Sequence, residues 1–337
     1  MSKVTVVDTS LRDGSHSVRH QFSPDEVAKI AKGLEESGVD IIEIGHGDGL
    51  TGSTINYGFA KASDYDLVKA ASDVLTKSKI AVLLIPGIGT VEDLEEMRTA
   101  GCSVVRVATH VTEADISAQH IKASKDMGFY TVGFLMMSHM AGADRVVEEA
   151  LKMESYGADT IYVTDSGGAM LNRDVREKIG RVKEAVKIPV GHHAHNNLGL
   201  AVSNSITAIE AGATFIDGSL GGLGAGSGNT PTELLSAVMK REGIENNTDL
   251  YKLLDTCDDI LRPILDEKGV HLSIDHDSLM IGYAGVYSSF LLHARRASKR
   301  FNVDVRDILM ELGRIGAIGG QEDLIISVAN DLSKKKK

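Results

Sequence analysis

The chain has 337 residues, of which 42% are hydrophobic and 25% charged, and its net charge is −11. These values are typical of a globular protein with a large buried core. The acidic balance argues against nucleic acid or an anionic membrane as a general partner. Two distant cysteines, Cys102 and Cys257, exclude a disulfide framework and predict a reducing, cytoplasmic location. No signal peptide or membrane span is expected, because a predicted strand starts at once and the longest apolar run, Ala81–Ile85, is short.

Short β-branched runs alternate with helical patterns along most of the chain. Because parallel strands need crossover connections, this alternation predicts repeated βα units. Eight such units favour a closed (β/α)8 TIM barrel, and an open doubly wound sheet is the alternative. The predicted strands are Val4–Thr9, Val39–Gly45, Ile80–Pro86, Val104–Thr109, Thr131–Met136, Thr160–Ser166, Ile188–His195 and Phe215–Leu220.

The segment Ser23–Gly38 shows the clearest helical pattern, with a capping Ser23, Pro24 at the first helical position and an apolar stripe. No further strand is expected after about residue 235. Helical patterns there cover Leu250–Leu265, Val286–Asn302, Asp304–Gly313 and Asp323–Leu332. We therefore predict a barrel domain over residues 1–265 and a small helical C-terminal extension over residues 266–337, a candidate region for partner contact.

Polar side chains follow three of the predicted strands, where functional groups of such barrels gather. His193 and His195 are two residues apart, so both imidazoles point to the same side of their strand. The first and seventh strands are separated only by the eighth, so Asp13 can meet the two histidines. The polar residues at these ends are Asp8, Arg12, Asp13, His16, Asp165, Ser166, His193 and His195.

Two imidazoles and one carboxylate would leave about three positions open on an octahedral ion. A 2-oxo acid could fill two of them, and Mn²⁺ or a similar divalent ion fits such a site better than a structural zinc does. Arg12 is interpreted as a clamp for an enolate, with a surface ion pair as the alternative. His16 is the best candidate base because imidazole titrates near neutral pH, and an exposed loop residue is its alternative.

Several other motifs have two interpretations. His192 points opposite to its neighbours and is interpreted as structural, while His46 either orders a loop or serves the site. The glycine-rich segment 221–231 is a tight rim turn rather than a phosphate loop, since it lacks the P-loop lysine. Tyr283 and Tyr287 would form a packing stripe if helical, or one phenol reaches the pocket mouth.

The motifs together resemble the 4-hydroxy-2-oxovalerate aldolases, members of a superfamily of metal-dependent barrel lyases and synthases that share Leu-Arg-Asp-Gly. The resemblance covers nearly the whole chain. The matching segments are Thr9–His16, His46–Gly49, Asn56–Phe59, Leu84–Gly89, Thr164–Gly167, His193–Asn196, Gly282–Tyr287 and Gly319–Glu322.

The resemblance implies cleavage of 4-hydroxy-2-oxopentanoate to pyruvate and acetaldehyde, and the reverse aldol addition. It implies a divalent ion, usually Mn²⁺ and otherwise Co²⁺ or Mg²⁺, and an acylating acetaldehyde dehydrogenase as partner. The implied site has Asp13, His193 and His195 as metal ligands, Arg12 stabilising the pyruvate enolate, His16 as base, Ser166 contacting substrate, and Tyr287, rather than Tyr283, lining the aldehyde side.

Two rival functions belong to different classes. A Claisen synthase that uses acetyl-CoA shares Arg-Asp-Gly and His-x-His, but such synthases read Arg-Asp-Gly-Glu-Gln, whereas this chain has Ser15-His16. A non-catalytic scaffold barrel with a structural metal is the other alternative. An imine-forming aldolase is disfavoured, because no lysine lies at a predicted strand end.

Overall fold

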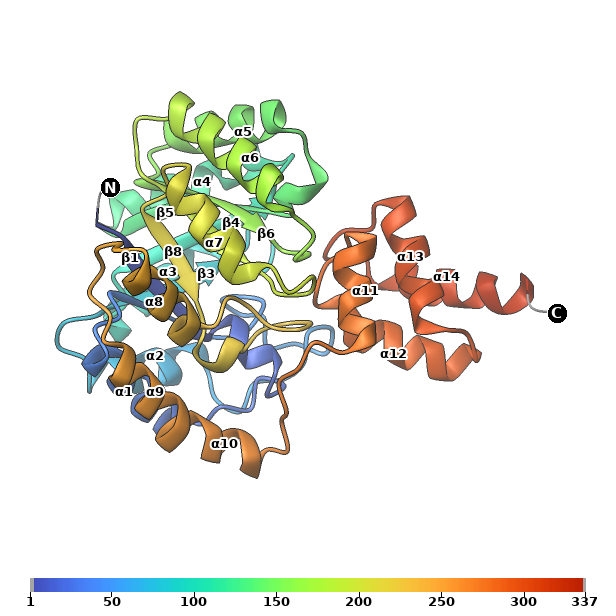
Figure 1. Ribbon diagram of the computed structural model, residues 1–337, viewed down its shortest axis with the longest axis horizontal. Helices are drawn as coiled ribbons and strands as arrows, with labels where there is room; N and C mark the ends of the chain where they lie inside the picture. The colour runs from blue at the N-terminus through green and yellow to red at the C-terminus, as the bar shows by residue number, and fades with distance from the viewer. Residues whose placement is uncertain (1–2, 336–337) are drawn as a thin grey trace.

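Eight parallel strands follow one another around a closed barrel, in the order β1 to β8, and β8 pairs with β1. The computed structural model describes residues 3–335 (Figure 1). Every predicted strand is present within a few residues of its expected bounds. The closed ring confirms the predicted (β/α)8 barrel, and the alternative prediction of an open sheet is wrong. The strands are β1 Thr5–Leu11, β2 Ile41–Ile44, β3 Lys79–Leu84, β4 Val104–His110, β5 Tyr130–Met136, β6 Thr160–Asp165, β7 Val190–Ala194 and β8 Phe215–Gly218.

Helices cover the outside of the barrel (Figure 1). The first begins where the sequence predicts, because Ser23 and Glu26 form a reciprocal capping box at its N-terminus. Its apolar stripe, Val27, Ile30, Ala31 and Leu34, is fully buried against the strands. These outer helices are α1 Pro24–Glu36, α2 Asp64–Ser72, α3 Val91–Ala100, α4 Ala118–Asp126, α5 Ala143–Ser155, α6 Asn172–Ala185, α7 Ala201–Glu210 and α8 Thr232–Arg241.

The predicted helix Leu250–Leu265 is present, with a π-helical turn in its middle: α9 Leu250–Asp255, η5 Thr256–Leu261 and α10 Arg262–Glu267. The hydroxyl of Thr256 lies between α1 and this helix and donates to the Gly33 carbonyl. A Cβ at Gly33 would stand 2.6 Å from the Thr256 methyl group. The glycine therefore permits the close packing of these two helices.

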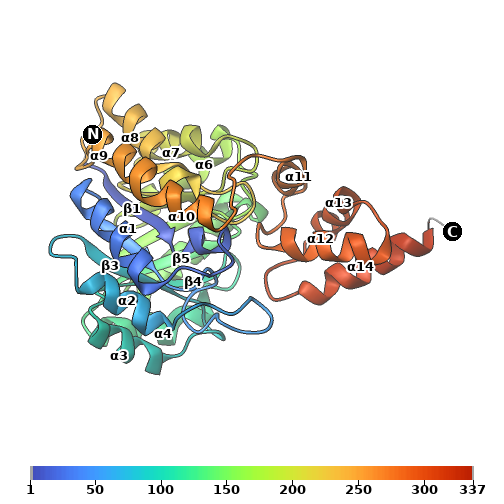
Figure 2. The same cartoon turned by 90° about the horizontal axis from the view of Figure 1, so that it is seen from below.

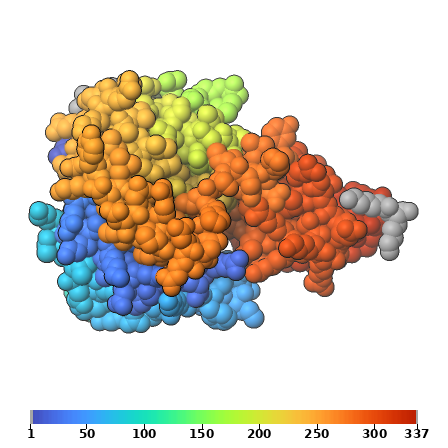
Figure 3. All heavy atoms as spheres, turned by 60° about the horizontal axis from the view of Figure 1, so that its bottom comes forward, coloured from blue at the N-terminus to red at the C-terminus, as the bar shows by residue number. Residues whose placement is uncertain are grey.

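Four further helices form a second lobe beside the barrel (Figures 1, 2 and 3). They are α11 His276–Ala284, α12 Phe290–Phe301, α13 Val305–Ile315 and α14 Glu322–Lys335, and they share a hydrophobic core of their own. The predicted division at residues 265/266 stays a prediction; this position lies inside α10. Residues 336–337 of that predicted extension lie outside the described part.

The sequence prediction near residue 285 is wrong in two respects. Helix α11 was not expected, and the predicted helix from Val286 starts only at Phe290. The cause is Gly285, whose φ of 66° ends α11 in a left-handed turn. Tyr283 and Tyr287 therefore do not share a helix, and the proposed aromatic stripe does not form.

The segment between α11 and α12 attaches the second lobe to the barrel mouth. Ser288 donates from Oγ to the Ser166 carbonyl at 2.8 Å and accepts from the Asn197 amide at 2.9 Å. His139 hydrogen-bonds the Gly285 carbonyl at 3.1 Å. None of the helices in residues 3–335 is long and apolar enough to cross a membrane.

A buried ionic layer crosses the barrel interior. Along β4 the side chains alternate, so that Arg106 points inward between apolar neighbours. Its guanidinium lies over the rings of Phe134 and Tyr162, with centroids at 4.5 and 4.4 Å. It pairs with Glu43 of β2 at 3.0 Å and with Asp217 of β8 at 2.6 Å. Burial disfavours the charge, but the two carboxylates more than offset it and raise the pKa of Arg106.

Replacing this cation should strongly destabilise the barrel. Arg106→Met removes the cation between the buried Glu43 and Asp217, which then keep only Arg12 and His193 as partners, and this costs about 3–5 kcal/mol of unfolding free energy. Denaturant unfolding of the purified variant measures the loss. The matched control is Arg98→Met, which removes a half-exposed ion pair with Glu95 on α3 and should leave the midpoint unchanged. Equal midpoints for the two variants would contradict the stabilising role of the layer.

Candidate active site

A small pocket opens at the C-terminal ends of the strands and contains every residue of the predicted site. The turn before α12 covers it from the second lobe. Its lining consists of Arg12, Asp13, His16, Leu83, Phe134, Met136, Thr164, Ser166, His193, His195, Ala225, Tyr287, Ser288 and Ser289.

The three predicted metal ligands meet in this pocket. Asp13 Oδ2 lies 3.8 Å from Nε2 of His193 and 3.8 Å from Nε2 of His195, and all three side chains are buried. The Nδ1 atoms face other acceptors: His193 hydrogen-bonds Asp217 at 2.8 Å, and His195 the Ala225 carbonyl at 3.3 Å. These partners place the proton on Nδ1 and leave both Nε2 lone pairs directed at the carboxylate.

The charges of this group also suit a divalent ion. Burial opposes the charge of Asp13, but the Arg12 guanidinium beside it holds its pKa well below the usual range. Burial lowers the pKa of His195 to about 4, so its imidazole is neutral at pH 7. One carboxylate and two imidazoles form a donor set that can hold a metal ion.

Arg12 connects this group to the ionic layer beneath it. Its Nε donates to Glu43 at 2.8 Å, and its Nη1 donates to Asp13 at 2.7 Å and to the Gly47 carbonyl at 3.3 Å. Among the residues that the structure describes, none accepts from Nη2 at hydrogen-bond distance. The guanidinium is thus fixed in place with one donor nitrogen available for an oxygen-rich ligand.

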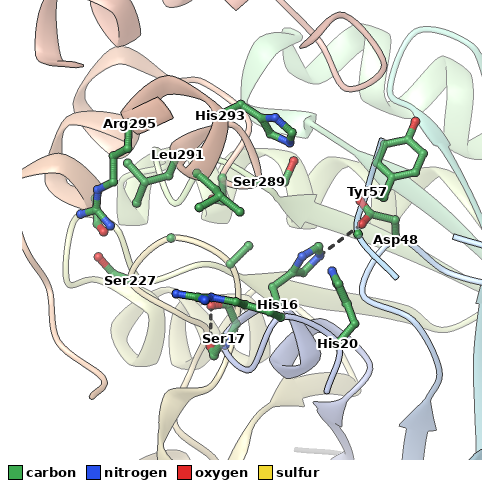
Figure 4. Close-up of a pocket in the computed structure, with 18 of the residues that line it drawn as sticks. His16, Ser17, His20, Asp48, Tyr57, Ser227, Ser289, Leu291, His293 and Arg295 are labelled. Carbon is green, nitrogen blue, oxygen red and sulfur yellow. Dashed lines mark hydrogen bonds and ion pairs between the residues drawn. The ribbon is translucent and has the colours of Figure 1, made fainter. Parts of the chain in front are cut away.

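His16 lies at the edge of the pocket and also lines a larger cavity of about 470 Å³ between the barrel rim and the second lobe. Figure 4 shows its ring directed at Asp48 with His20 beside it, and the Nε2–Oδ2 distance to Asp48 is 4.0 Å. The ring of His46 is buried, hydrogen-bonds the Gly58 carbonyl at 3.0 Å, and accepts from the Asp48 amide. This agrees with the loop-ordering interpretation of His46.

His16, His20 and Asp48 also lie close enough together to hold an ion. The nitrogens of His20 are already engaged, however. Its Nδ1 accepts from the Gly47 amide at 3.3 Å, and its ring also hydrogen-bonds the Tyr57 carbonyl. The group around Asp13, with two free Nε2 lone pairs, is therefore the better metal site.

Of the remaining predicted residues, Ser166 and Tyr287 line the pocket, whereas Tyr283 and His192 do not. Ser166 lines the pocket and its Oγ accepts from the Met137 amide at 3.0 Å. Tyr287 also lines it, and burial raises the pKa of its phenol. Tyr283, in contrast, is 70% exposed on α11. His192 faces away from the barrel interior and hydrogen-bonds the Val163 carbonyl, as a structural residue does.

The glycine-rich segment after β8 is a tight turn against the site, as the rim-turn interpretation expects. Its Ala225 amide donates to Asp13 Oδ1 at 3.1 Å, so the turn fixes a predicted ligand. A Cβ at Gly228, where φ is 85°, would lie 1.7 Å from the Gly222 carbonyl oxygen. Only glycine fits there.

Sequence reasoning missed four charged residues around the site: Glu43, Asp48, Arg106 and Asp217. Two of them stand in the middle of β-branched runs, in Ile-Ile-Glu43-Ile and Val-Val-Arg106-Val. A buried charge must be paired, so a charged residue inside an apolar strand predicts an ion pair in the barrel interior.

Models of two known protein families together match most of the chain. A model of the HMGL-like family matches residues 3–260, and a model of the DmpG-like communication domain matches residues 272–334. The carboxyl transferase domain of pyruvate carboxylase from Rhizobium etli has the same fold, with a TM-score of 0.84 at 12% identity, over 100% of this chain and 62% of that chain.

Two curated relatives are similar over their whole length. The 4-hydroxy-2-oxovalerate aldolase of Carboxydothermus hydrogenoformans is 56% identical, covering 99% of each chain. That of Moorella thermoacetica is 55% identical over 99% of this chain and 98% of its own. The resemblance seen in the motifs is confirmed: the chain belongs to the HMGL-like family and, within it, to the 4-hydroxy-2-oxovalerate aldolases.

Proposed function

We propose that this protein cleaves 4-hydroxy-2-oxopentanoate to pyruvate and acetaldehyde and catalyses the reverse aldol addition. The observation that carries the proposal is the convergence of Asp13, His193 and His195 beside a fixed Arg12 in one pocket. The similarity to named aldolases over the full chain supports it further.

Asp13, His193 and His195 would hold the metal, and Mn²⁺ is the ion we propose, because mixed oxygen and nitrogen ligands with open positions suit it. Bound there, a divalent ion polarises the 2-oxo group of the substrate and lowers the energy of developing negative charge. Co²⁺ and Mg²⁺ are the alternatives. Asp217 would orient His193 as a ligand through the Nδ1 hydrogen bond.

The residues of the chain carry the remaining steps. His16 takes the proton of the 4-hydroxyl group, whose O–H electrons form the carbonyl of acetaldehyde. The C3–C4 bond breaks and its electrons form the enolate, whose oxygen Arg12 stabilises with a charged donor. C3 then takes up a proton, which completes pyruvate. Ser166 would contact the substrate, and Tyr287 would close the aldehyde side of the pocket.

The test is to incubate the purified protein with 4-hydroxy-2-oxopentanoate and Mn²⁺ and to measure pyruvate with and without chelator. Pyruvate that appears only with metal supports the aldolase. Thiol release from acetyl-CoA in the presence of a 2-oxo acid would instead identify a Claisen synthase. Absence of both reactions would leave the scaffold interpretation.

We also propose that the second lobe binds an acylating acetaldehyde dehydrogenase, which would consume the aldehyde product in the cytoplasm. The match of residues 272–334 to a communication domain supports this partner. Gel filtration of the two mixed proteins tests it, and separate elution at micromolar concentrations would contradict it.

His193→Ala should weaken metal retention, because it removes one of three ligands. Metal analysis after dialysis measures the effect as a metal:protein ratio well below that of the unmodified protein. The matched control is His192→Ala, which removes the neighbouring imidazole from the opposite face of β7 and should keep the metal. Equal metal contents of the two variants would remove His193 from the ligand set.

Arg12→Ala should lower kcat for cleavage by about 10²–10³-fold, because one charged donor at the enolate oxygen is lost. The pyruvate assay at saturating Mn²⁺ gives this number. Arg296→Ala serves as the control, since Arg296 lines only the outer cavity. Turnover of Arg12→Ala close to that of this control would refute the enolate role.

Tyr287→Phe should change the preference among aldehydes in the addition direction more than it changes the KM for pyruvate. The reason is that the phenol lines the pocket, whereas the Tyr283 side chain is exposed. Competition between acetaldehyde and propanal, followed by product analysis, measures the preference. Tyr283→Phe is the control, and a shift in that variant alone would reverse the assignment.

A further inference from the structure

A cluster of His20, His46 and Asp48 packs against the ring of His16, outside the metal group. The rings of His20 and His46 stack with centroids 3.7 Å apart, and His16 meets His20 edge-on at 4.9 Å. Asp48, only 8% exposed at its side chain, lies 4.0 Å from His16 Nε2 and 3.7 Å from His46 Nδ1. His16 therefore has an aromatic wall on one side and a carboxylate at its Nε2 atom.

The loop after β2 is shaped to receive this ring. A Cβ at Gly47 would lie 2.5 Å from Nε2 of His16, so the glycine makes the space that the imidazole fills. The Gly47 amide donates to His20 Nδ1, and the Asp48 amide donates to His46 Nδ1. The same short loop thus holds both supporting rings.

The turn after His16 is strained. Arg19 and His20 are consecutive non-glycine residues with φ of 55° and 60°. Such a conformation persists only where the surroundings fix it. Here the His20 amide donates to the Ser15 carbonyl at 2.7 Å, and its ring hydrogen-bonds Ser15 Oγ at 3.3 Å. These two hydrogen bonds hold His20 against the short helix η1, Asp13–His16, which carries the base.

We propose that Asp48 is a positioning residue for His16, with His20 and His46 as the wall that fixes the ring. Asp48 orients the imidazole toward the 4-hydroxyl group and faces the positive charge that forms when His16 takes the proton. The Asp48 carboxylate faces His16 Nε2 at 4.0 Å, and catalytic contacts are often long in the absence of substrate. This inference rests on the proposed function, since it assigns a partner to its base.

The alternative is that Asp48 merely orders the loop. A double-mutant cycle separates the two roles, because a residue that acts through His16 loses its effect once His16 is absent. The variants are Asp48→Asn, His16→Ala and the double variant, assayed for cleavage of 4-hydroxy-2-oxopentanoate with Mn²⁺. We expect Asp48→Asn alone to lower kcat about 10–100-fold, part of the gain that a general base supplies, with KM changed less than about threefold. When Asp48→Asn is added to His16→Ala, we expect kcat to change further by less than about threefold.

The matched control is Asp64→Asn. Asp64 orders the same loop by accepting from the His46 and Thr51 amides at 2.9 and 3.0 Å, with no contact to His16. Any loss from this variant should be equal in both backgrounds. An equal loss from Asp48→Asn in both backgrounds, or a raised KM with unchanged kcat, would overturn the proposal.

Two precautions keep the outcome decisive. If turnover of His16→Ala is below detection, the kcat and KM of Asp48→Asn decide between the two roles of Asp48. If Asp48→Asn does not fold, Asp48→Ser replaces it. Absence of pyruvate from the unmodified protein would refute the proposed function itself. An active unmodified protein with an additive cycle would refute only the role of Asp48.

Discussion

The chain of buried charges through the barrel is the interaction on which the site depends. Arg106 pairs with Glu43 and Asp217, and these two carboxylates in turn hold Arg12 and His193. Every link is buried, so each charge needs its neighbour, and none can turn away without leaving another unpaired. The same pairing that stabilises the barrel core therefore fixes one predicted metal ligand and the predicted enolate clamp before any ligand arrives.

The upper wall of the site comes from distant parts of the chain. The glycine-rich turn after β8 fixes Asp13, and the turn before α12 brings Tyr287 and Ser288 over the pocket. Because Ser288 hydrogen-bonds the Ser166 carbonyl, the second lobe is attached to the barrel at a pocket residue itself. A change in the position of that lobe would act directly on the pocket, which makes it a suitable place for contact with a partner.

Much of this arrangement could be predicted from sequence, because it depends on local periodicity. The β-branched runs gave all eight strands, and the His-x-His spacing placed two imidazoles on one face. The ionic layer escaped prediction, since pairing Glu43, Arg106 and Asp217 requires knowing which side chains meet across the barrel. The helix start after Gly285 was misplaced for a different reason: the pattern from Val286 is helical, but the left-handed Gly285 ends α11 and the next helix starts only at Phe290.

The residues proposed to stabilise the enolate and the proposed base are supported by different parts of the structure. The enolate side rests on rigid strands through the ionic layer, whereas His16 rests on a short helix and a strained turn that the loop after β2 supports. A base must approach its proton within hydrogen-bond reach, so a small shift of this turn would affect proton transfer while leaving metal binding intact. Substitutions around Asp48 should therefore alter turnover without loss of the metal, whereas substitutions around Asp217 should alter both.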